Sequence, residues 1–220
     1  MDDLKKHERF EIETLEKLNS GKFLEPLVFG GGTMLRLCYE LDRYSVDLDF
    51  WFIKKVPEKE YFAKLKDHLG KDLEITDACI KYHTLLLEAR SPDYPKRLKI
   101  EIRRMMKECD LQERIAFSKY STVQVILKAH TLEQTMKNKI EAALERKEIR
   151  DCFDIEFMLR KGISLPADKE RLAALAHLID GFREKDYKVT LGSILEAGTR
   201  SYYVKNGFSF LAEKIRQARS

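Results

Sequence analysis

The chain has few of the features that mark secreted, membrane-bound or zinc-stabilised proteins. Its four cysteines are scattered without a Cys-x-x-Cys pair, which fits reduced thiols and disfavours a disulfide or zinc framework. No apolar run approaches the roughly 20 residues of a membrane span, and the N-terminal segment lacks the apolar core of a secretory signal. We therefore expect a protein of the cytoplasm with no membrane partner.

Several catalytic signatures are also missing. The five histidines show no metal-ligand spacing, no Ser-His-Asp arrangement is recognisable, and the glycine cluster at 30–32 lacks the lysine of a P-loop. The net charge is only +4, so overall basicity is weak evidence for a nucleic-acid partner. These absences disfavour a serine hydrolase and a P-loop ATPase.

The order of local patterns predicts two parts. With 220 residues the chain can form one large domain or two small ones. Apolar periodicity and turn residues predict helices over 3–18, 33–40 and 58–69, and extended segments over 26–29, 46–53, 73–76, 79–89, 97–103 and 123–127. After His130 only helices are expected, over 131–146, 150–160 and 166–181, with two shorter ones following. We predict an α/β domain over 1–125 and a helical domain over 126–220.

The stretch from Gly30 to Phe50 carries the most chemical information. Its glycine cluster opens a predicted helix, where the backbone can approach phosphate oxygens and the first amides point at an anion. On the extended strand that follows, Asp47 and Asp49 project from the same face. Two carboxylates on one strand face suit Mg²⁺, which prefers hard oxygen ligands. The pattern favours a site for a nucleoside triphosphate and its metal ions.

A third carboxylate is expected from a neighbouring strand, because two-metal phosphoryl transfer needs several that converge. Glu101 suits this role, with Lys99 and Arg103 on the same face of the segment 97–103. The alternative is a solvated sheet face with cross-strand ion pairs. The region from Pro95 to Lys119 also has an excess of basic residues, which either a solvated surface or a phosphate-binding patch explains.

These residues resemble a known family. Gly31-Gly32-Thr33 followed by Arg43-x-Ser45-x-Asp47-Leu48-Asp49 resembles the first motif of the AbiEii/AbiGii toxin family of nucleotidyltransferases, within the DNA polymerase β-like superfamily. Lys99-Ile100-Glu101 is similar to the second motif, Lys-x-Asp, with glutamate replacing aspartate and without the threonine that often follows. Lys139-x-x-Ala142-x-x-x-Arg146-x-x-x-Arg150-Asp151-x-x-Asp154 is similar to the third and fourth motifs. The resemblance covers roughly residues 28–160.

The resemblance implies an α+β fold: a polymerase β-like mixed sheet flanked by helices, followed by a C-terminal helical bundle that completes the active-site cleft. It implies a nucleotidyltransferase that moves a nucleoside monophosphate from an NTP to an acceptor. The protein would be the toxin of a type IV toxin–antitoxin system, with tRNA as acceptor and an antitoxin as partner.

The same resemblance assigns residues to roles. Mg²⁺ or Mn²⁺ would be bound by Asp47, Asp49 and Glu101, and Lys139 and Asp151 would join them as catalytic residues. The NTP would be bound by Gly31, Gly32, Thr33, Arg43, Ser45, Lys99 and Lys139.

Other readings of these residues stay open. Lys139 is also explained as a surface lysine, Arg43 and Ser45 as residues that stabilise a turn, and Asp151 as part of a structural network with Arg150. The acceptor could instead be a protein side chain or a small molecule such as an aminoglycoside. Because Glu101 replaces the usual aspartate, a non-catalytic binding protein that keeps the fold is a further alternative.

Overall fold

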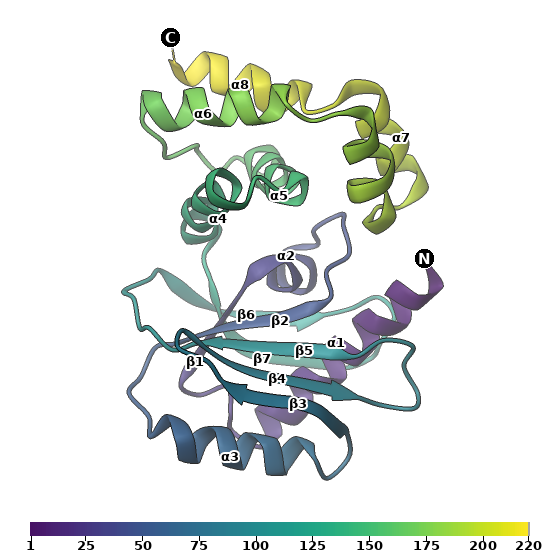
Figure 1. Ribbon diagram of the computed structural model, residues 1–220, viewed down its shortest axis with the longest axis vertical. Helices are drawn as coiled ribbons and strands as arrows, with labels where there is room; N and C mark the ends of the chain where they lie inside the picture. Colours follow the sequence, from purple (N-terminus) through teal and green to yellow (C-terminus); the bar gives the residue numbers. More distant parts are fainter. Residues whose placement is uncertain (220) are drawn as a thin grey trace. The chain divides into compact units, whose positions relative to one another are not determined.

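The computed structural model describes residues 1–219, which divide into two compact units (Figure 1). The sheet unit comprises Met1–Glu40 and Tyr44–His130, and the helical unit comprises Leu41–Arg43 and the described residues from Thr131 onward. The chain therefore passes between units at three places along the sequence. None of the described helices is long and apolar enough to cross a bilayer.

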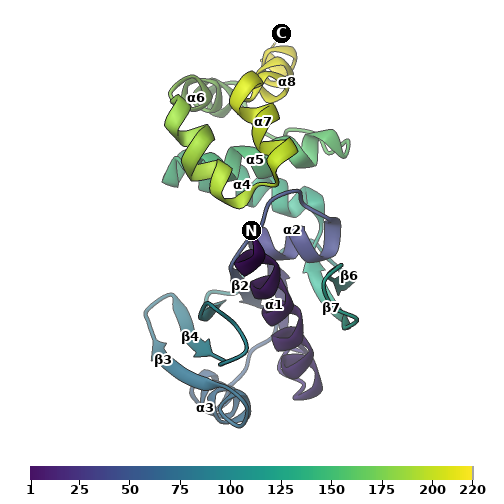
Figure 2. The same ribbon diagram turned by 90° about the vertical axis from the view of Figure 1, so that its right-hand side faces the viewer.

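The sheet unit is built on a mixed seven-stranded sheet of order β3-β4-β5-β2-β1-β7-β6. Its strands are β1 (Leu27–Gly30), β2 (Asp47–Phe52), β3 (Glu74–Ile80), β4 (Thr84–Arg90), β5 (Leu98–Arg103), β6 (Leu111–Phe117) and β7 (Gln124–His130). The pairs β2–β5 and β1–β7 are parallel, and the other neighbouring pairs are antiparallel. Figure 2 shows β3 and β4 on one side of this unit and β6 and β7 on the other, with α1 between them.

Helices α1 (Asp2–Ser20), α2 (Gly31–Tyr39) and α3 (Glu58–Leu69) pack on this sheet. Helix α1 contacts β5, β7 and α3, whereas α2 contacts β1, β2 and β6. Strand β2 alternates in burial: Leu48, Phe50 and Phe52 are buried, while the alternating residues Asp47, Asp49 and Trp51 are half-buried. The buried residues enter the core with the apolar side chains of α1, so β2 presents its carboxylates on the opposite face.

The helical unit consists of short helices with well-defined ends. They are α4 (Leu132–Arg146), α5 (Ile149–Arg160), α6 (Lys169–Asp180), a π-helix (Asp186–Leu191), a 3₁₀ turn (Gly192–Ile194), α7 (Ala197–Asn206) and α8 (Ser209–Arg219). The side chains of Thr131 and Asp168 accept hydrogen bonds from Gln134 N and Arg171 N, as N-cap residues do. Residue Arg43 belongs to this unit through an isolated β-bridge with Leu195.

The predicted α+β fold with a mixed sheet is confirmed, but some elements differ from the sequence prediction. The expected single extended segment 79–89 is wrong: it contains the turn of the β3–β4 hairpin. Strand β6 was not predicted, because its sequence LQERIAF lacks regular apolar alternation and gains its order by pairing with β7. This pairing extends β7 to His130, so the units divide after that residue, whereas the sequence predicted a boundary after 125.

Candidate active site

The parallel pairing of β2 with β5 brings the predicted carboxylates onto adjacent strands. Asp49 lies directly opposite Glu101 in the register, and Asp47 lies opposite Lys99. The side chains of Asp47 and Glu101 are partly exposed, whereas their chain neighbours Leu48 on β2 and Ile100 on β5 are buried. All three carboxylates therefore belong to one face of the sheet, as the sequence predicted.

A lysine ammonium lies among these carboxylates. Lys99 Nζ is 3.0 Å from Glu101 Oε1 and 3.6 Å from Asp47 Oδ2. Partial burial opposes the charge on Lys99, but the hydrogen bond that Lys99 donates to Glu101 and the charges of Asp47, Glu101 and Asp49 outweigh it and raise the pKa of Lys99. On the other side of Glu101, Arg103 Nη2 is 3.7 Å from Oε2. A cation is thus electrostatically favoured at this position.

The donor set fits a divalent cation, because three carboxylates supply the hard oxygen ligands that Mg²⁺ prefers. Within residues 1–219, no three His, Cys, Asp or Glu side chains already converge as a metal-binding group. The ammonium of Lys99 offsets part of the negative charge of Asp47 and Glu101 in this arrangement. Metal binding by Asp47, Asp49 and Glu101 stays a prediction.

Gly31 is required by a close approach to the carboxylate of Asp49. Its φ is +74°, and a Cβ atom at this position would lie 2.3 Å from Asp49 Oδ2. Gly30, the N-cap of α2, is extended, and a Cβ there would meet Trp51 Cζ3 at 2.5 Å and His130 Nδ1 at 2.8 Å. The first turn of α2 is therefore in contact with Asp49, at a helix N-terminus where negative charge is favoured.

Thr33 has a different set of contacts from those that the family resemblance implies. Its side chain is fully buried, and its hydroxyl lies 2.7 Å from Asp47 O and 3.3 Å from Glu11 Oε1. The hydroxyl thereby joins α2 to the first residue of β2. Gly32 is also buried, and Ser45 lies half-buried in the segment before β2. Their predicted contacts with a triphosphate stay predictions.

The predicted residues of the helical unit form a buried ionic network. Lys139 Nζ lies 3.0 Å from Asp151 Oδ1 and 2.6 Å from Asp154 Oδ2. Arg43 makes a bidentate pair with Asp154, in which Nε and Nη2 are 2.6 and 2.7 Å from the two oxygens. Arg146 Nη2 lies 3.1 Å from both oxygens of Asp151. Both aspartates are fully buried, so Asp151 does belong to a structural network, although through Lys139 and Arg146.

Two participants were given no role in the predicted site. Asp154 belongs to the motif that resembles the family, and it lies three residues after Asp151 on α5, a spacing that places both on one helix face. His7 of α1 approaches β2, as described below, and polar residues within the apolar face of a predicted helix were the available signal. Neither signal specifies its long-range partner.

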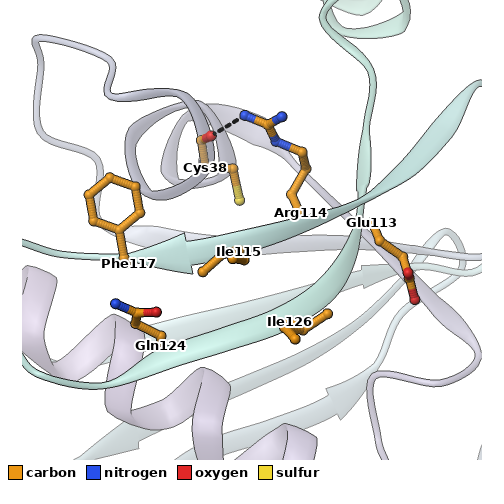
Figure 3. A pocket seen from close by; sticks show the side chains of 7 residues that line it. All are labelled: Cys38, Glu113, Arg114, Ile115, Phe117, Gln124 and Ile126. Carbon is orange, nitrogen blue, oxygen red and sulfur yellow. Dashed lines mark hydrogen bonds between the residues drawn. The ribbon is translucent and has the colours of Figure 1, made fainter.

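A hollow in the sheet unit is lined by none of these residues. It has a volume of about 610 Å³ and opens beside β6, β7 and α2 (Figure 3). Cys38, Arg114, Ile115, Phe117 and Ile126 are among its lining residues, and Arg114 Nη2 donates to Cys38 O at 3.0 Å. Strands β1 and β7 separate β6 from β2 in the sheet, so the hollow is distinct from the carboxylates.

The family comparison identifies the class of protein as a nucleotidyltransferase toxin family. The family model described as "Nucleotidyl transferase AbiEii toxin, Type IV TA system" matches residues 14–216, and the chain belongs to this family. The resemblance seen in the motifs is confirmed. No curated protein matches the sequence significantly.

Two solved structures share the fold at low sequence identity. The crystal structure of JHP933 from Helicobacter pylori is 20% identical, with a TM-score of 0.56 over 95% of this chain and 94% of that one. A candidate nucleotidyltransferase from Helicobacter pylori is also 20% identical, with a TM-score of 0.57 over 96% and 97%. The MenT4 nucleotidyltransferase toxin of Mycobacterium tuberculosis is 18% identical, with a TM-score of 0.48 over 96% and 89%.

Proposed function

We propose that this protein transfers a nucleoside monophosphate from an NTP to the 3′ end of a tRNA, as the toxin of a type IV toxin–antitoxin system. One observation carries the proposal: the parallel register places Asp49 opposite Glu101, next to Asp47 and the glycine turn of α2. Family membership supports the transferase class and the presence of an antitoxin partner. The proposed site of action is the cytoplasm.

The proposed reaction is a displacement at the α-phosphorus of the NTP. The acceptor hydroxyl oxygen forms a bond to this phosphorus, the bond to the bridging oxygen of the β-phosphate breaks, and pyrophosphate leaves with its electron pair. Glu101 accepts the hydroxyl proton. Asp47, Asp49 and Glu101 would hold Mg²⁺ or Mn²⁺, which would supply charge stabilisation to the phosphate oxygens. Because carboxylate positions decide such chemistry, the extra methylene of Glu101 matters: a 1 Å misplacement can cost about 10²-fold.

The surrounding residues have supporting roles in this proposal. Gly31, Gly32 and the first turn of α2 bind the triphosphate through backbone amides. Lys99, which is 3.0 Å from Glu101, exchanges its carboxylate contacts for phosphate oxygens when the nucleotide binds. Lys139 contributes positive charge, as phosphoryl transfer requires. Arg43 and Ser45 complete the nucleotide-binding set that the family motif implies.

A nucleic-acid acceptor is supported by the surface that follows Glu101 along β5. The side chain of Arg103 is 46% exposed, and its backbone pairs with Thr84 at the start of β4. The turn between β3 and β4 carries Tyr82, which is 84% exposed, and the centroid of its ring lies 4.4 Å from that of His83. An exposed aromatic ring beside basic residues is suited to stacking an unpaired base and contacting its phosphate.

Arg104, by contrast, holds this turn in place. Its Nε lies 2.6 Å from Glu58 Oε2, and Nη1 donates to Lys81 O at 2.8 Å and Tyr82 O at 3.0 Å. Reversing its charge would disturb the hairpin, so acceptor contacts are better tested at Arg103 and Tyr82.

The first experiment is a transfer assay with each α-labelled NTP, Mg²⁺ and total tRNA. We expect label on RNA with the wild type and none with Asp49→Ala. Arg103→Glu and Tyr82→Ala should raise the KM for tRNA about tenfold while leaving the KM for NTP within threefold, since one stacked base contributes ~1–3 kcal/mol. Lys64→Glu, an exposed charge reversal on α3, is the matched control and should behave as wild type.

The outcomes separate the alternatives. Label on a protein band or a small molecule would reject the tRNA acceptor and retain the transferase chemistry. No label with any acceptor, together with no Mg²⁺-dependent NTP binding, would support a non-catalytic binding protein. Equal losses of NTP and tRNA use in Arg103→Glu would reject the acceptor surface.

A further inference from the structure

The face of α1 that packs on the sheet contains polar side chains where apolar ones would be expected. His7, Glu11 and Thr14 follow helical spacing and are 0%, 1% and 1% exposed. Within residues 1–219, His7 Nδ1, Glu11 Oε2 and Thr14 Oγ1 are buried without a hydrogen-bond partner. Buried polar atoms without partners destabilise a fold, so packing alone would favour leucine at such positions.

Two of these side chains reach the point where the chain enters β2. His7 Nε2 lies 2.9 Å from the carbonyl oxygen of Val46, so Nε2 carries the hydrogen and donates. The next carbonyl, Asp47 O, accepts from the Thr33 hydroxyl at 2.7 Å. Glu11 Oε1 lies 3.3 Å from the same hydroxyl and 3.9 Å from His7 Nε2.

Glu11 is suited to this position as a neutral acid. Burial, followed by the nearby charge of Glu8, raises its pKa well above the ordinary value. The Thr33 hydroxyl has one hydrogen, which the shorter contact to Asp47 O takes. A protonated Glu11 supplies the hydrogen for the second contact, that between Glu11 Oε1 and the Thr33 hydroxyl. Glu11 thereby stabilises the position of the Thr33 hydroxyl, next to His7.

We propose that His7, together with Glu11, is a positioning residue that holds the backbone of β2 so that Asp47 is correctly placed for the proposed metal-dependent transfer. The inference rests on the proposed function for its catalytic consequence. Its geometric basis is independent: successive carbonyls at 46 and 47 are hydrogen-bonded by α1 and by α2. His7 and Glu11 precede residue 14, where the match to the family model begins.

The consequence for Asp47 follows from the register. Asp47 is the first residue of β2 and pairs with Lys99 of β5, so it has ladder neighbours on its C-terminal side only. The hydrogen bonds to Val46 O and Asp47 O restrain the other side. Without them the first residue of the strand can fray, and the carboxylate moves with it.

The test compares His7→Leu, His7→Gln and the control Glu16→Leu at an exposed position of α1. We expect His7→Leu to lower kcat about 10–100-fold, as the loss of outer-shell partners of metal ligands does. The Mg²⁺ concentration for half-maximal activity should rise, and the KM for tRNA should stay within threefold. His7→Gln retains an N–H donor and should recover most of the activity, whereas Glu16→Leu should match the wild type.

Amide hydrogen exchange gives a readout that does not depend on activity. Residues 45–49 should exchange faster in His7→Leu than in the wild type and His7→Gln, while β7 should not change. Unchanged exchange at 45–49, a wild-type kcat in His7→Leu, or equal losses in both His7 variants would overturn the inference. If the wild type transfers no nucleotide to any acceptor, the proposed function fails, and the exchange result alone decides whether His7 anchors β2.

Discussion

Asp154→Asn removes a negative charge that two buried cations share. Arg43 lies 2.6 and 2.7 Å from its oxygens and Lys139 lies 2.6 Å away, and the Arg43 and Asp154 side chains are 3% and 0% exposed. Removing one partner of a buried ion pair destabilises a protein by about 3–5 kcal/mol. We expect the lower end, because Asp151 still pairs with Lys139 and its charge also favours Arg43.

The loss can be measured by urea unfolding followed by far-ultraviolet circular dichroism, which follows the helices. Trp51 is the single tryptophan and lies on β2, so its fluorescence reports on the sheet unit separately. In thermal unfolding, a loss of about 3 kcal/mol should lower the Tm by about 6–12 °C in a chain of this length. The dichroism transition should shift more than the fluorescence transition, because the network belongs to the helical unit.

Two controls make this prediction specific to burial. Glu74→Gln breaks an exposed pair with Arg90 and should change stability by less than about 0.5 kcal/mol. The double variant Arg43→Met with Asp154→Leu removes both charges and should recover part of the loss. A change below about 1 kcal/mol in Asp154→Asn would refute the reasoning, because it would mean that Arg43 is solvated or re-paired without cost.

Three further predictions concern the sheet unit. Gly31→Ala should abolish transfer in the labelled-NTP assay while the protein stays folded by circular dichroism, because a Cβ would meet Asp49 Oδ2 at 2.3 Å. Burial raises the pKa of Glu11, so the folded state retains a proton that the unfolded state releases above about pH 4.3. Urea unfolding should therefore show Glu11→Gln gaining stability relative to the wild type as pH rises from 5 to 8; a constant difference would contradict this. Burial lowers the pKa of His130 to about 4, so its neutral form favours folding above about pH 6.5. Acidification from pH 6.5 to 4 should lower the free energy of unfolding by roughly 3 kcal/mol through this residue. An NMR titration that gives the His130 imidazole a pKa near 6.5 would disprove this.

Much of the site was predictable because its chemistry is local in sequence. The spacing of Asp47 and Asp49 places both on one strand face wherever that strand pairs, and Thr131 caps α4 through its own neighbours. Helix α3 has the bounds 58–69 that its periodicity predicts. The order of the family motifs likewise depends on residue types and intervals, so the family could be recognised before any pairing was known.

Other features depend on contacts between distant residues. The parallel register that sets Asp49 opposite Glu101 joins strands about fifty residues apart. The sequence of β6 has little strand pattern, and this segment becomes a strand because it pairs with β7. Equally, nothing near Arg43 in sequence specifies its pairing with Asp154.

The sequence by itself determined most of the elements, the family and the placement of Asp47 and Asp49 on one strand face, because periodicity, capping and motif spacing act between near neighbours. Only the tertiary structure decided that Lys99 lies among those carboxylates, that Gly31 contacts Asp49, and that His7 supports the start of β2. Such contacts depend on strand register and helix placement, which minimise the free energy of the whole packed unit and leave no signature within any single segment.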